Sequence, residues 1–329
     1  MSKDLLVVVE HDGEKARRAS LEALALARRM AGHLGGRACA AVLGHGVEAV
    51  ANEVAGKGAD EVFLLEHELL ASYTPDAYRL PLVELVRDGG FEWVLAGNTY
   101  QAQDFLPLVA VAFGAPVVSD AVDVDLGDRV VFHRGVFNGK LVAKTVDDGP
   151  APHFATLQSG AFPADDLPEG HGGTVTRKDV DLSPAQLRRK VLEVIAADDQ
   201  AVDLTAAEII VSGGRGLGDK ETFESLVGGL AKVLGAAVGA SRPVVDNEWL
   251  PHEHQVGSSG QTVQPKLYVA LAISGAIQHV IGMRGSQVVV AVNRDKDAPI
   301  FNEATYGIVG DVKEVVPALI QAIEEAKAR

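Results

Sequence analysis

Five short stretches in the C-terminal part of the sequence carry residue types suited to holding a ligand. Each follows an apolar run and combines glycine with hydroxyl, amide or basic side chains: SGGRG at 212–216, GASRP at 239–243, QVGSSG at 255–260, ISGAIQH at 273–279 and NRD at 293–295. Glycines after a strand let backbone amides approach an anion, and arginine adds a fixed positive charge. Ligands of doubly wound sheets bind beyond the carboxyl ends of strands, so the stretches are candidates for a binding site there.

Taken singly, each stretch also fits a simpler interpretation. Arg215 and Arg242 fit solvated arginines at a turn and at a strand exit, and Gly257 to Gly260 fits a plain flexible loop. An isolated histidine such as His279 is more often a satisfied buried side chain than a functional group. Asp311, after the apolar run that ends at Gly310, suits either hydrogen bonds from a ribose or the cap of the last helix.

The common phosphate and nucleophile motifs do not occur in this sequence. No intact GxGxxG follows the opening apolar run, no GxxxxGK[ST] is present, and no GxSxG surrounds a serine. His252, Glu253 and His254 resemble a metal-ligand cluster, but no HExxH spacing or cysteine supports one, so no metal is expected. A standard Rossmann, P-loop, serine hydrolase or zinc site is therefore not predicted.

Composition narrows the class of protein further. The chain has 329 residues, 47% hydrophobic and 23% charged, which is typical of a globular protein of about two domains. A net charge of −15 without a basic run makes it a poor candidate for binding nucleic acid. The single cysteine, Cys39, excludes an intrachain disulfide, and no apolar stretch approaches the roughly 20 residues of a membrane span. We expect a cytoplasmic protein without a signal peptide or transmembrane segment.

The elements that must position the candidate site alternate along the chain. Short apolar runs predict buried strands and alternate with helical patterns, with Ser20 as a possible N-cap of the first helix. In the first half we expect strands at 5–10, 39–43, 61–65 and 93–96 and helices at 21–34, 47–55, 75–87 and 103–113. This βαβα order predicts an α/β fold with a mainly parallel sheet covered by helices.

The pattern changes near the middle of the chain. Strand-like runs at 130–134 and 141–146 flank Asn138-Gly139, which predicts an antiparallel hairpin, and 154–157 is expected to be the final strand of the first domain. Residues 160–178 have loop composition, so we expect a linker over roughly 160–200, with a junction helix at 188–197. The predicted domains are 1–200 and 201–329.

A second doubly wound domain is expected after the linker. Strands are predicted at 208–212, 267–273 and 287–292, and helices at 223–234 and 312–327. A further helix is expected to open at Gly275, with Ser274 as its N-cap. Two Rossmann-like domains, the first with an antiparallel hairpin addition, are thus the predicted fold class.

Read together, the C-terminal motifs resemble the FAD domain of electron transfer flavoprotein alpha subunits. SGGRG, GASRPVVD, QVG followed by glycine, LAISGAIQH, and NRDKDAPIF followed by YGIVGD cover most of 212–311. The first half fits more loosely, through its opening LLVVVEHD and the VFNGKLVAK hairpin region. The resemblance implies a bound FAD and an electron carrier rather than a substrate-converting enzyme.

The resemblance also implies roles for individual residues. Those expected to contact FAD are Arg215, Ser241, Arg242, Gln255, Val256, Gly257, Ser258, Ser259, Ser274, Gly275, Ala276, Ile277, Gln278, His279, Asn293, Asp311 and Val312.

Within this set, phosphate and ribityl contacts are implied for Arg215, Ser241, Ser274 and Gln278. Asn293 and Asp311 are implied at the adenosine end.

Arg242 is implied to lie against the isoalloxazine ring, and His279 is implied to approach the flavin O2 side. Together they would favour an anionic reduced flavin. The loop Gly257 to Gly260 would face the flavin near N5. This chain has Ser258-Ser259 where family members usually have Gln-Thr, which preserves a hydroxyl and removes a longer amide.

The resemblance further implies a heterodimer with a smaller beta subunit that carries AMP, or a second FAD in electron-bifurcating forms. Donors would be acyl-CoA dehydrogenases of fatty acid beta-oxidation or other flavin dehydrogenases, and the acceptor a quinone oxidoreductase or another protein. Two alternatives stay open from the residues: an adenine-nucleotide-binding α/β protein, and a non-redox assembly subunit that has lost its flavin.

Overall fold

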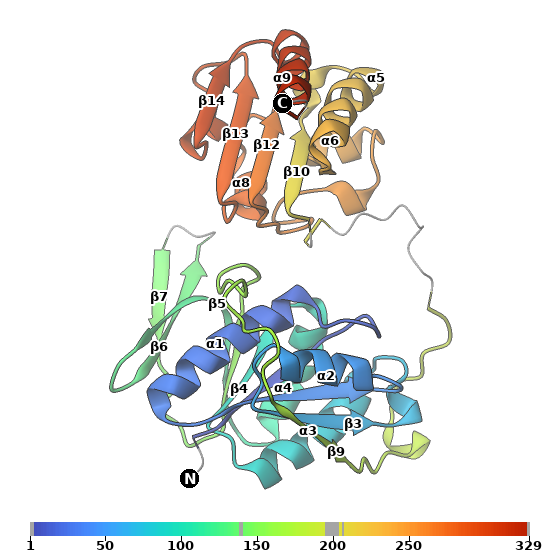
Figure 1. Cartoon of the computed structure of the whole chain (residues 1–329), viewed down its shortest axis with the longest axis vertical. Helices are drawn as coiled ribbons and strands as arrows, with labels where there is room; N and C mark the ends of the chain where they lie inside the picture. Colours follow the sequence, from blue (N-terminus) through green and yellow to red (C-terminus); the bar gives the residue numbers. More distant parts are fainter. Residues whose placement is uncertain (1–2, 138–140, 195–203, 206, 328–329) are drawn as a thin grey trace. The chain divides into compact units, whose positions relative to one another are not determined.

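The structure is a computed structural model that describes residues 3–137, 141–194, 204–205 and 207–327. The chain divides into two compact units, Met1–Ile195 and Ala196–Arg329. Each unit contains a mainly parallel sheet covered by helices, which confirms the predicted fold class (Figure 1). No helix among these residues has both the length and the apolarity needed to cross a bilayer.

The first unit is built on a nine-stranded sheet of order β7-β6-β5-β8-β4-β1-β2-β3-β9. Its strands are β1 (Leu5–Val9), β2 (Ala38–Gly44), β3 (Glu61–Glu66), β4 (Trp93–Gly97), β5 (Val117–Leu126), β6 (Val130–Val136), β7 (Leu141–Thr145), β8 (His153–Leu157) and β9 (Thr174–Lys178). Its helices are α1 (Arg18–Leu34), α2 (Glu48–Gly56), α3 (Pro75–Gly89) and α4 (Tyr100–Val111).

Both faces of this sheet are buried because successive strand residues point to opposite sides. In β1, Leu5 and Val7 join a core cluster with α1 and α2, while Leu6 and Val8 join a second cluster with α3 and α4. This explains why the strand is a continuous apolar run rather than an alternating one.

The hairpin expected around Asn138-Gly139 is confirmed by its strands. β6 pairs with β7 antiparallel, with Val136 opposite Leu141. The turn itself, 138–140, lies outside the described residues. β5 pairs in parallel with β8 and antiparallel with β6, so β6 and β7 extend the first sheet by two strands beyond its parallel part.

Three sequence-based expectations for the first unit are wrong. The strand at 153–157 is not the last, because β9 follows and pairs in parallel with β3, so part of the stretch expected to be loop is a sheet edge. Residues 188–194 are not helical, and the rest of the predicted junction helix lies outside the described residues. Ser20 does not cap α1; its hydroxyl accepts a hydrogen bond from the Glu10 backbone N–H, 2.8 Å away.

The second unit has a five-stranded, fully parallel sheet of order β11-β10-β12-β13-β14. Its strands are β10 (Ile209–Gly213), β11 (Ala237–Ala240), β12 (Leu267–Leu271), β13 (Val288–Asn293) and β14 (Tyr306–Val309). Its helices are α5 (Lys220–Phe223), α6 (Gly229–Leu234), α7 (Arg242–Asp246), α8 (Ile277–Met283) and α9 (Val312–Lys327), with a π-helical turn at Glu224–Gly228 between α5 and α6.

The order of β10, β12 and β11 creates a reversal point in this sheet. β10 lies between β11 and β12, so the chain leaves β10 in one direction and returns to its other side. One face is covered by α6 and α9, and the other by α8 (Figure 1). Open α/β sheets bind ligands outside the carboxyl ends of strands at such a point.

Candidate functional site

The second unit contains a pocket of about 970 Å³ at the carboxyl ends of its strands. Lining residues follow every strand of the sheet: Gly214 to Gly218 after β10, Ser241 to Pro243 after β11, Ala272 to Ser274 after β12, Asn293 and Arg294 at the end of β13, and Gly310 to Lys313 after β14. The volume is at the upper end of the range for ligand pockets, about 300–1,000 Å³, so it suits an extended ligand.

Most residues predicted to bind the cofactor line this pocket. They are Arg215, Ser241, Arg242, Gln255, Val256, Gly257, Ser259, Ser274, Ala276, Gln278, His279, Asn293, Asp311 and Val312. Ser258, Gly275 and Ile277 do not line it. Strand ends far apart in sequence therefore bring the predicted residues to one place, while their contact with a cofactor remains a prediction.

Ser274 does not cap α8 as expected. The helix begins at Ile277, and its N-cap residue is Ala276, which makes no side-chain cap. Gly275 adopts a φ of 87°, and a Cβ there would lie 2.2 Å from the Ile300 nitrogen, so the chain turns away before helix formation. This leaves the Ser274 side chain exposed at the pocket wall.

The loop after β10 passes very close to the loop after β12. A Cβ on Gly214 would lie 2.2 Å from the backbone oxygen of Ala272, and one on Gly216 would lie 3.0 Å from the same oxygen. Real Cβ atoms do not approach as closely as 2.2 Å, so glycine at 214 allows the two strand ends to converge, and a Cβ at 216 would be tight. Ala272 itself has a φ of 52°, a conformation that L residues rarely adopt.

The loop from Gln255 to Gly260 forms another wall. The buried Gln255 side chain donates from Nε2 to the backbone oxygen and to the hydroxyl of Ser259, each 3.0 Å away. The Ser258 N–H donates to the Gln278 carbonyl at 2.7 Å. The loop is thus held to its own base and to the start of α8.

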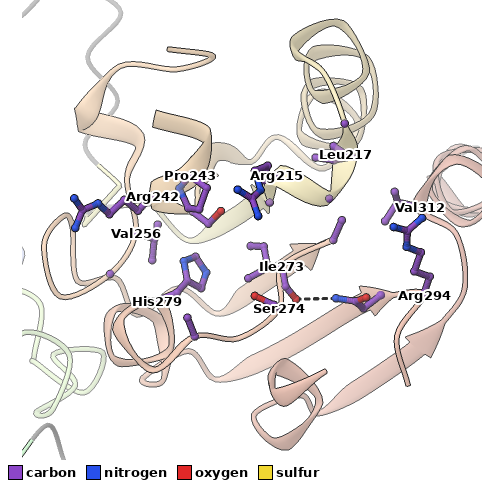
Figure 2. A pocket seen from close by; sticks show the side chains of 18 of the residues that line it. Arg215, Leu217, Arg242, Pro243, Val256, Ile273, Ser274, His279, Arg294 and Val312 are labelled. Atoms are coloured by element: carbon purple, nitrogen blue, oxygen red, sulfur yellow. Dashed lines mark hydrogen bonds between the residues drawn. The ribbon is translucent and has the colours of Figure 1, made fainter. Parts of the chain in front are cut away.

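His279 is buried at the pocket wall, near Val256 in the close view (Figure 2). Its Nε2 lies 2.9 Å from the hydroxyl of Tyr268, and its Nδ1 has no hydrogen-bond partner among the described residues. Burial lowers the pKa of His279 to about 4, and the nearby Val256 carbonyl offsets this only in part. The ring is therefore neutral near pH 7.

Positive charge in the pocket comes instead from exposed side chains. Figure 2 shows Arg242 at the end near His279, Arg215 between the ends, and Arg294 at the opposite end near Val312. Arg242 lies 3.4 Å from the Asp246 carboxylate, and both are more than half exposed. Arg215 and Arg294 have no ion-pair partner within the described part of the chain. Free arginines of this kind are suited to anionic groups such as phosphates.

Asn293 and Asp311 already make hydrogen bonds within the chain. Asn293 Nδ2 donates to the Ile273 carbonyl at 3.0 Å, and its Oδ1 accepts from the Asp295 N–H at 3.0 Å. Asp311 Oδ1 accepts from the Lys313 N–H at 2.9 Å at the start of α9, which matches the helix-cap alternative. Each keeps a further hydrogen-bonding position that a ligand can use, an N–H on Asn293 and the second oxygen of Asp311.

The sequence reasoning missed Arg294 and Lys313, which line the same end of the pocket as Asp311. Arg294 directly follows Asn293, and Lys313 is two residues after Asp311. Their closeness to these predicted residues at strand ends was the signal that could have identified them. Tyr268 was also missed, because it lies inside an apolar strand and does not line the pocket.

Comparisons with known proteins agree with this architecture. Residues 5–185 match the family described as Electron transfer flavoprotein domain, and residues 203–284 match Electron transfer flavoprotein FAD-binding domain. The chain is 37% identical over 327 residues to the electron transfer flavoprotein subunit alpha of Thermoanaerobacterium thermosaccharolyticum, covering 99% of each chain. It is 38% identical to the subunit of the same name from Bacillus subtilis, covering 99% of this chain and 98% of that one.

Two further similarities, one to a relative by sequence and one to a solved structure, differ greatly in strength. The chain is 36% identical to the acryloyl-CoA reductase electron transfer subunit beta of Anaerotignum propionicum, covering 99% of this chain and 96% of that one. The solved structure of a thiamine diphosphate-dependent 4-hydroxybenzoylformate decarboxylase from Rhodococcus jostii RHA1 matches at 12% identity with a TM-score of 0.22. That match covers 98% of this chain and 59% of that one, and a similarity this low supports no inference.

Proposed function

This chain belongs to the electron transfer flavoprotein alpha-subunit family, and on that basis we propose that it binds FAD and carries electrons as one subunit of a cytoplasmic heterodimer. The observation that carries the proposal is the pocket of the second unit. All five strand ends contribute to it, and fourteen of the seventeen residues expected to contact the cofactor line it.

The pocket fits an FAD in three respects. Its volume of about 970 Å³ suits a dinucleotide-sized ligand. The close approach at Gly214, where a Cβ would lie 2.2 Å from the Ala272 oxygen, holds the ends of β10 and β12 together at the pocket wall. The Nδ1 of His279 is a buried polar atom without a partner among the described residues, and buried polar groups in native proteins normally have one.

We assign the residues of this chain as follows. Arg215, Ser241, Ser274 and Gln278 hold the phosphate and ribityl part of the ligand, with Arg215 supplying charge. A bound flavin supplies the redox chemistry, and the protein supplies position and electrostatics. Around the flavin ring, Arg242 provides positive charge, and His279 provides a neutral hydrogen-bonding group.

At the other end, Asn293, Arg294, Asp311 and Lys313 face the adenosine half of the ligand. The position of Asp311 at the start of α9 leaves one carboxylate oxygen available for a ribose hydroxyl. Arg294 adds a cation at the same end, where a solvent-exposed guanidinium can pair with a phosphate.

The partner in this proposal is a smaller beta subunit, as expected for the family. The relative from Anaerotignum propionicum is named as an electron transfer subunit of an acryloyl-CoA reductase. This name favours a flavin dehydrogenase that acts on acyl-CoA thioesters as the exchange partner of our chain. A quinone oxidoreductase or another electron acceptor completes the proposed route.

The test is to co-express the chain with a beta subunit and purify the complex. We expect a yellow heterodimer whose absorption spectrum and extracted cofactor identify FAD. A count of flavins per heterodimer then distinguishes one FAD with AMP from two FADs. A colourless chain that takes up no FAD on reconstitution would overturn the proposal and favour an assembly role, whereas uptake of adenine nucleotides alone would favour a nucleotide-binding protein.

A further inference from the structure

Tyr268 lies behind the pocket wall and is hydrogen-bonded to His279 in that wall. The residue is in β12, its side chain is 0% exposed, and its hydroxyl is 2.9 Å from Nε2 of His279 in α8. The two rings are tilted by 57° with centroids 6.1 Å apart, so the contact runs through the hydroxyl rather than through stacking. The partner on the pocket side is a histidine, whose two nitrogens can exchange donor and acceptor roles.

The direction of this hydrogen bond follows from what surrounds the hydroxyl. Burial raises the pKa of Tyr268, so the hydroxyl keeps its proton and needs an acceptor. The Ser212 hydroxyl lies beside Tyr268 and offsets part of this rise, but it makes no hydrogen bond of good geometry among the described residues. His279 Nε2 lies within hydrogen-bond distance of the Tyr268 hydroxyl. It accepts a hydrogen bond from that hydroxyl when the nitrogen carries no proton of its own.

The charge state of the His279 ring decides which of its two nitrogens carries the proton. The His279 ring is neutral near pH 7 because burial disfavours the charged form. A neutral imidazole has one N–H and one acceptor nitrogen. When Nε2 accepts from Tyr268, the proton is on Nδ1. This nitrogen makes no hydrogen bond of good geometry among the described residues, although the Val256 carbonyl is near the ring.

We propose that Tyr268 is a positioning residue that holds His279 in the tautomer with its proton on Nδ1, so that the pocket wall presents a fixed hydrogen-bond donor to the ligand. The ligand atom it serves is an acceptor such as a ring carbonyl oxygen. This inference rests on the proposed function for the identity of that ligand, but not for the tautomer. The pocket wall then offers a neutral donor whose direction is set by a tyrosine outside the pocket.

The first experiment measures the tautomer directly in the flavin-free, full-length chain. Nitrogen NMR with selectively labelled histidine distinguishes protonated from unprotonated ring nitrogens, and the signals lost in His279→Gln identify this residue. We expect an unprotonated Nε2 and a protonated Nδ1 at pH 7. A protonated Nε2 would overturn the proposal whether or not the chain binds flavin.

The second experiment compares Tyr268→Phe with a matched control, Tyr78→Phe. Tyr78 is also buried, and its hydroxyl donates to the Leu43 carbonyl at 3.2 Å in the first unit. We expect Tyr268→Phe to mix the two His279 tautomers, to weaken FAD binding by about tenfold, and to shift the flavin potential. Tyr78→Phe should leave all three unchanged.

The outcomes separate this inference from the proposed function. The expected tautomer in a chain that binds no FAD would sink the proposed function and leave the role of Tyr268 standing. Full FAD binding together with an unchanged tautomer in Tyr268→Phe would sink the inference and leave the proposed function standing.

Discussion

The side-chain amide of Gln255 donates to both the backbone oxygen and the hydroxyl oxygen of Ser259, at 3.0 Å in each case. Because the Ser259 hydroxyl accepts this bond, its own proton is left to point elsewhere, and Ser259 lines the pocket. Gln255 thus closes the loop and orients the hydroxyl that the family resemblance assigns to the flavin. The neighbouring Ser258 differs from Ser259 in position, because Ser258 does not line the pocket.

Replacing Gln255 with leucine should loosen this loop. Removing the amide deletes two hydrogen bonds and should cost the second unit about 1–2 kcal/mol in the free energy of unfolding. FAD affinity should fall about tenfold, because Ser259 is no longer oriented. Denaturant unfolding and FAD titration measure the two effects. Gln321→Leu, which removes one exposed side-chain bond to Glu325, is the control and should change stability by less than about 0.5 kcal/mol.

Placing a methyl group on Gly214 should separate the ends of β10 and β12. Its Cβ would lie 2.2 Å from the Ala272 oxygen, a backbone atom that cannot move aside cheaply. We expect Gly214→Ala to destabilise the second unit by about 1–3 kcal/mol and to reduce FAD binding. Trp249 fluorescence in a Trp93→Phe background reports unfolding of this unit alone, because the sequence has two tryptophans.

Gly228→Ala is the matched control for that variant. A Cβ at Gly228 meets nothing within 4 Å, and the residue has helical backbone angles. The change should be neutral or stabilising by about 0.5–1 kcal/mol. Equal losses of stability in the two variants would contradict the argument from close approach.

Arg242→Ala should affect the flavin and not the fold. Its side chain is 68% exposed and its ion pair with Asp246 is a surface pair, so the free energy of unfolding should change by less than about 1 kcal/mol. Loss of the positive charge should lower the flavin potential or the FAD occupancy, because an anionic reduced flavin loses its stabilising charge. A redox titration of the heterodimer measures the potential.

Lys220→Ala provides the comparison for Arg242→Ala. Lys220 is an exposed cation in an i,i+4 pair with Glu224 and does not line the pocket. It should leave both potential and occupancy unchanged. An unaltered potential and full flavin in Arg242→Ala would remove Arg242 from the proposed site.

Stability of the second unit should depend on His279 between about pH 4 and pH 6.5. Burial lowers its pKa in the folded state to about 4, below the unfolded value of about 6.5, so the unfolded chain binds more protons in this window. The free energy of unfolding therefore keeps this contribution from His279 above pH 6.5. It loses the contribution as the pH falls toward 4, by up to ~3 kcal/mol.

His279→Gln should reduce this slope, which unfolding by denaturant at several pH values measures through Trp249. The exposed His45 in the first unit provides the control variant, His45→Gln, which should retain the wild-type slope. A slope in His279→Gln as steep as in the wild type would show that other groups cause the pH dependence.

The sequence by itself determined the fold class and most of the elements. Continuous apolar runs such as Leu5–Val9 can be stable only as strands buried on both faces, so their number and spacing predicted a parallel sheet. The glycine and polar stretches after such runs predicted where ligand-binding residues lie, because strand ends in a parallel sheet share one edge. Local backbone chemistry was enough for these conclusions.

Other features were decided only by tertiary contacts. β9, Thr174 to Lys178, is almost entirely polar. It is a strand because the edge of β3 offers it hydrogen bonds, which no local pattern reveals. Ser274 is an adequate N-cap by type, yet the close approach of Gly275 to Ile300 starts the helix later.

The state of His279 depends most strongly on the folded structure. A histidine in a sequence carries neither a pKa nor a tautomer. Both arise when β12 places Tyr268 behind the ring and the surrounding residues remove water from it. Sequence can name the residue because its type is local information, but burial and hydrogen-bond direction are properties of the packed structure, so only the tertiary fold decides what this histidine can donate.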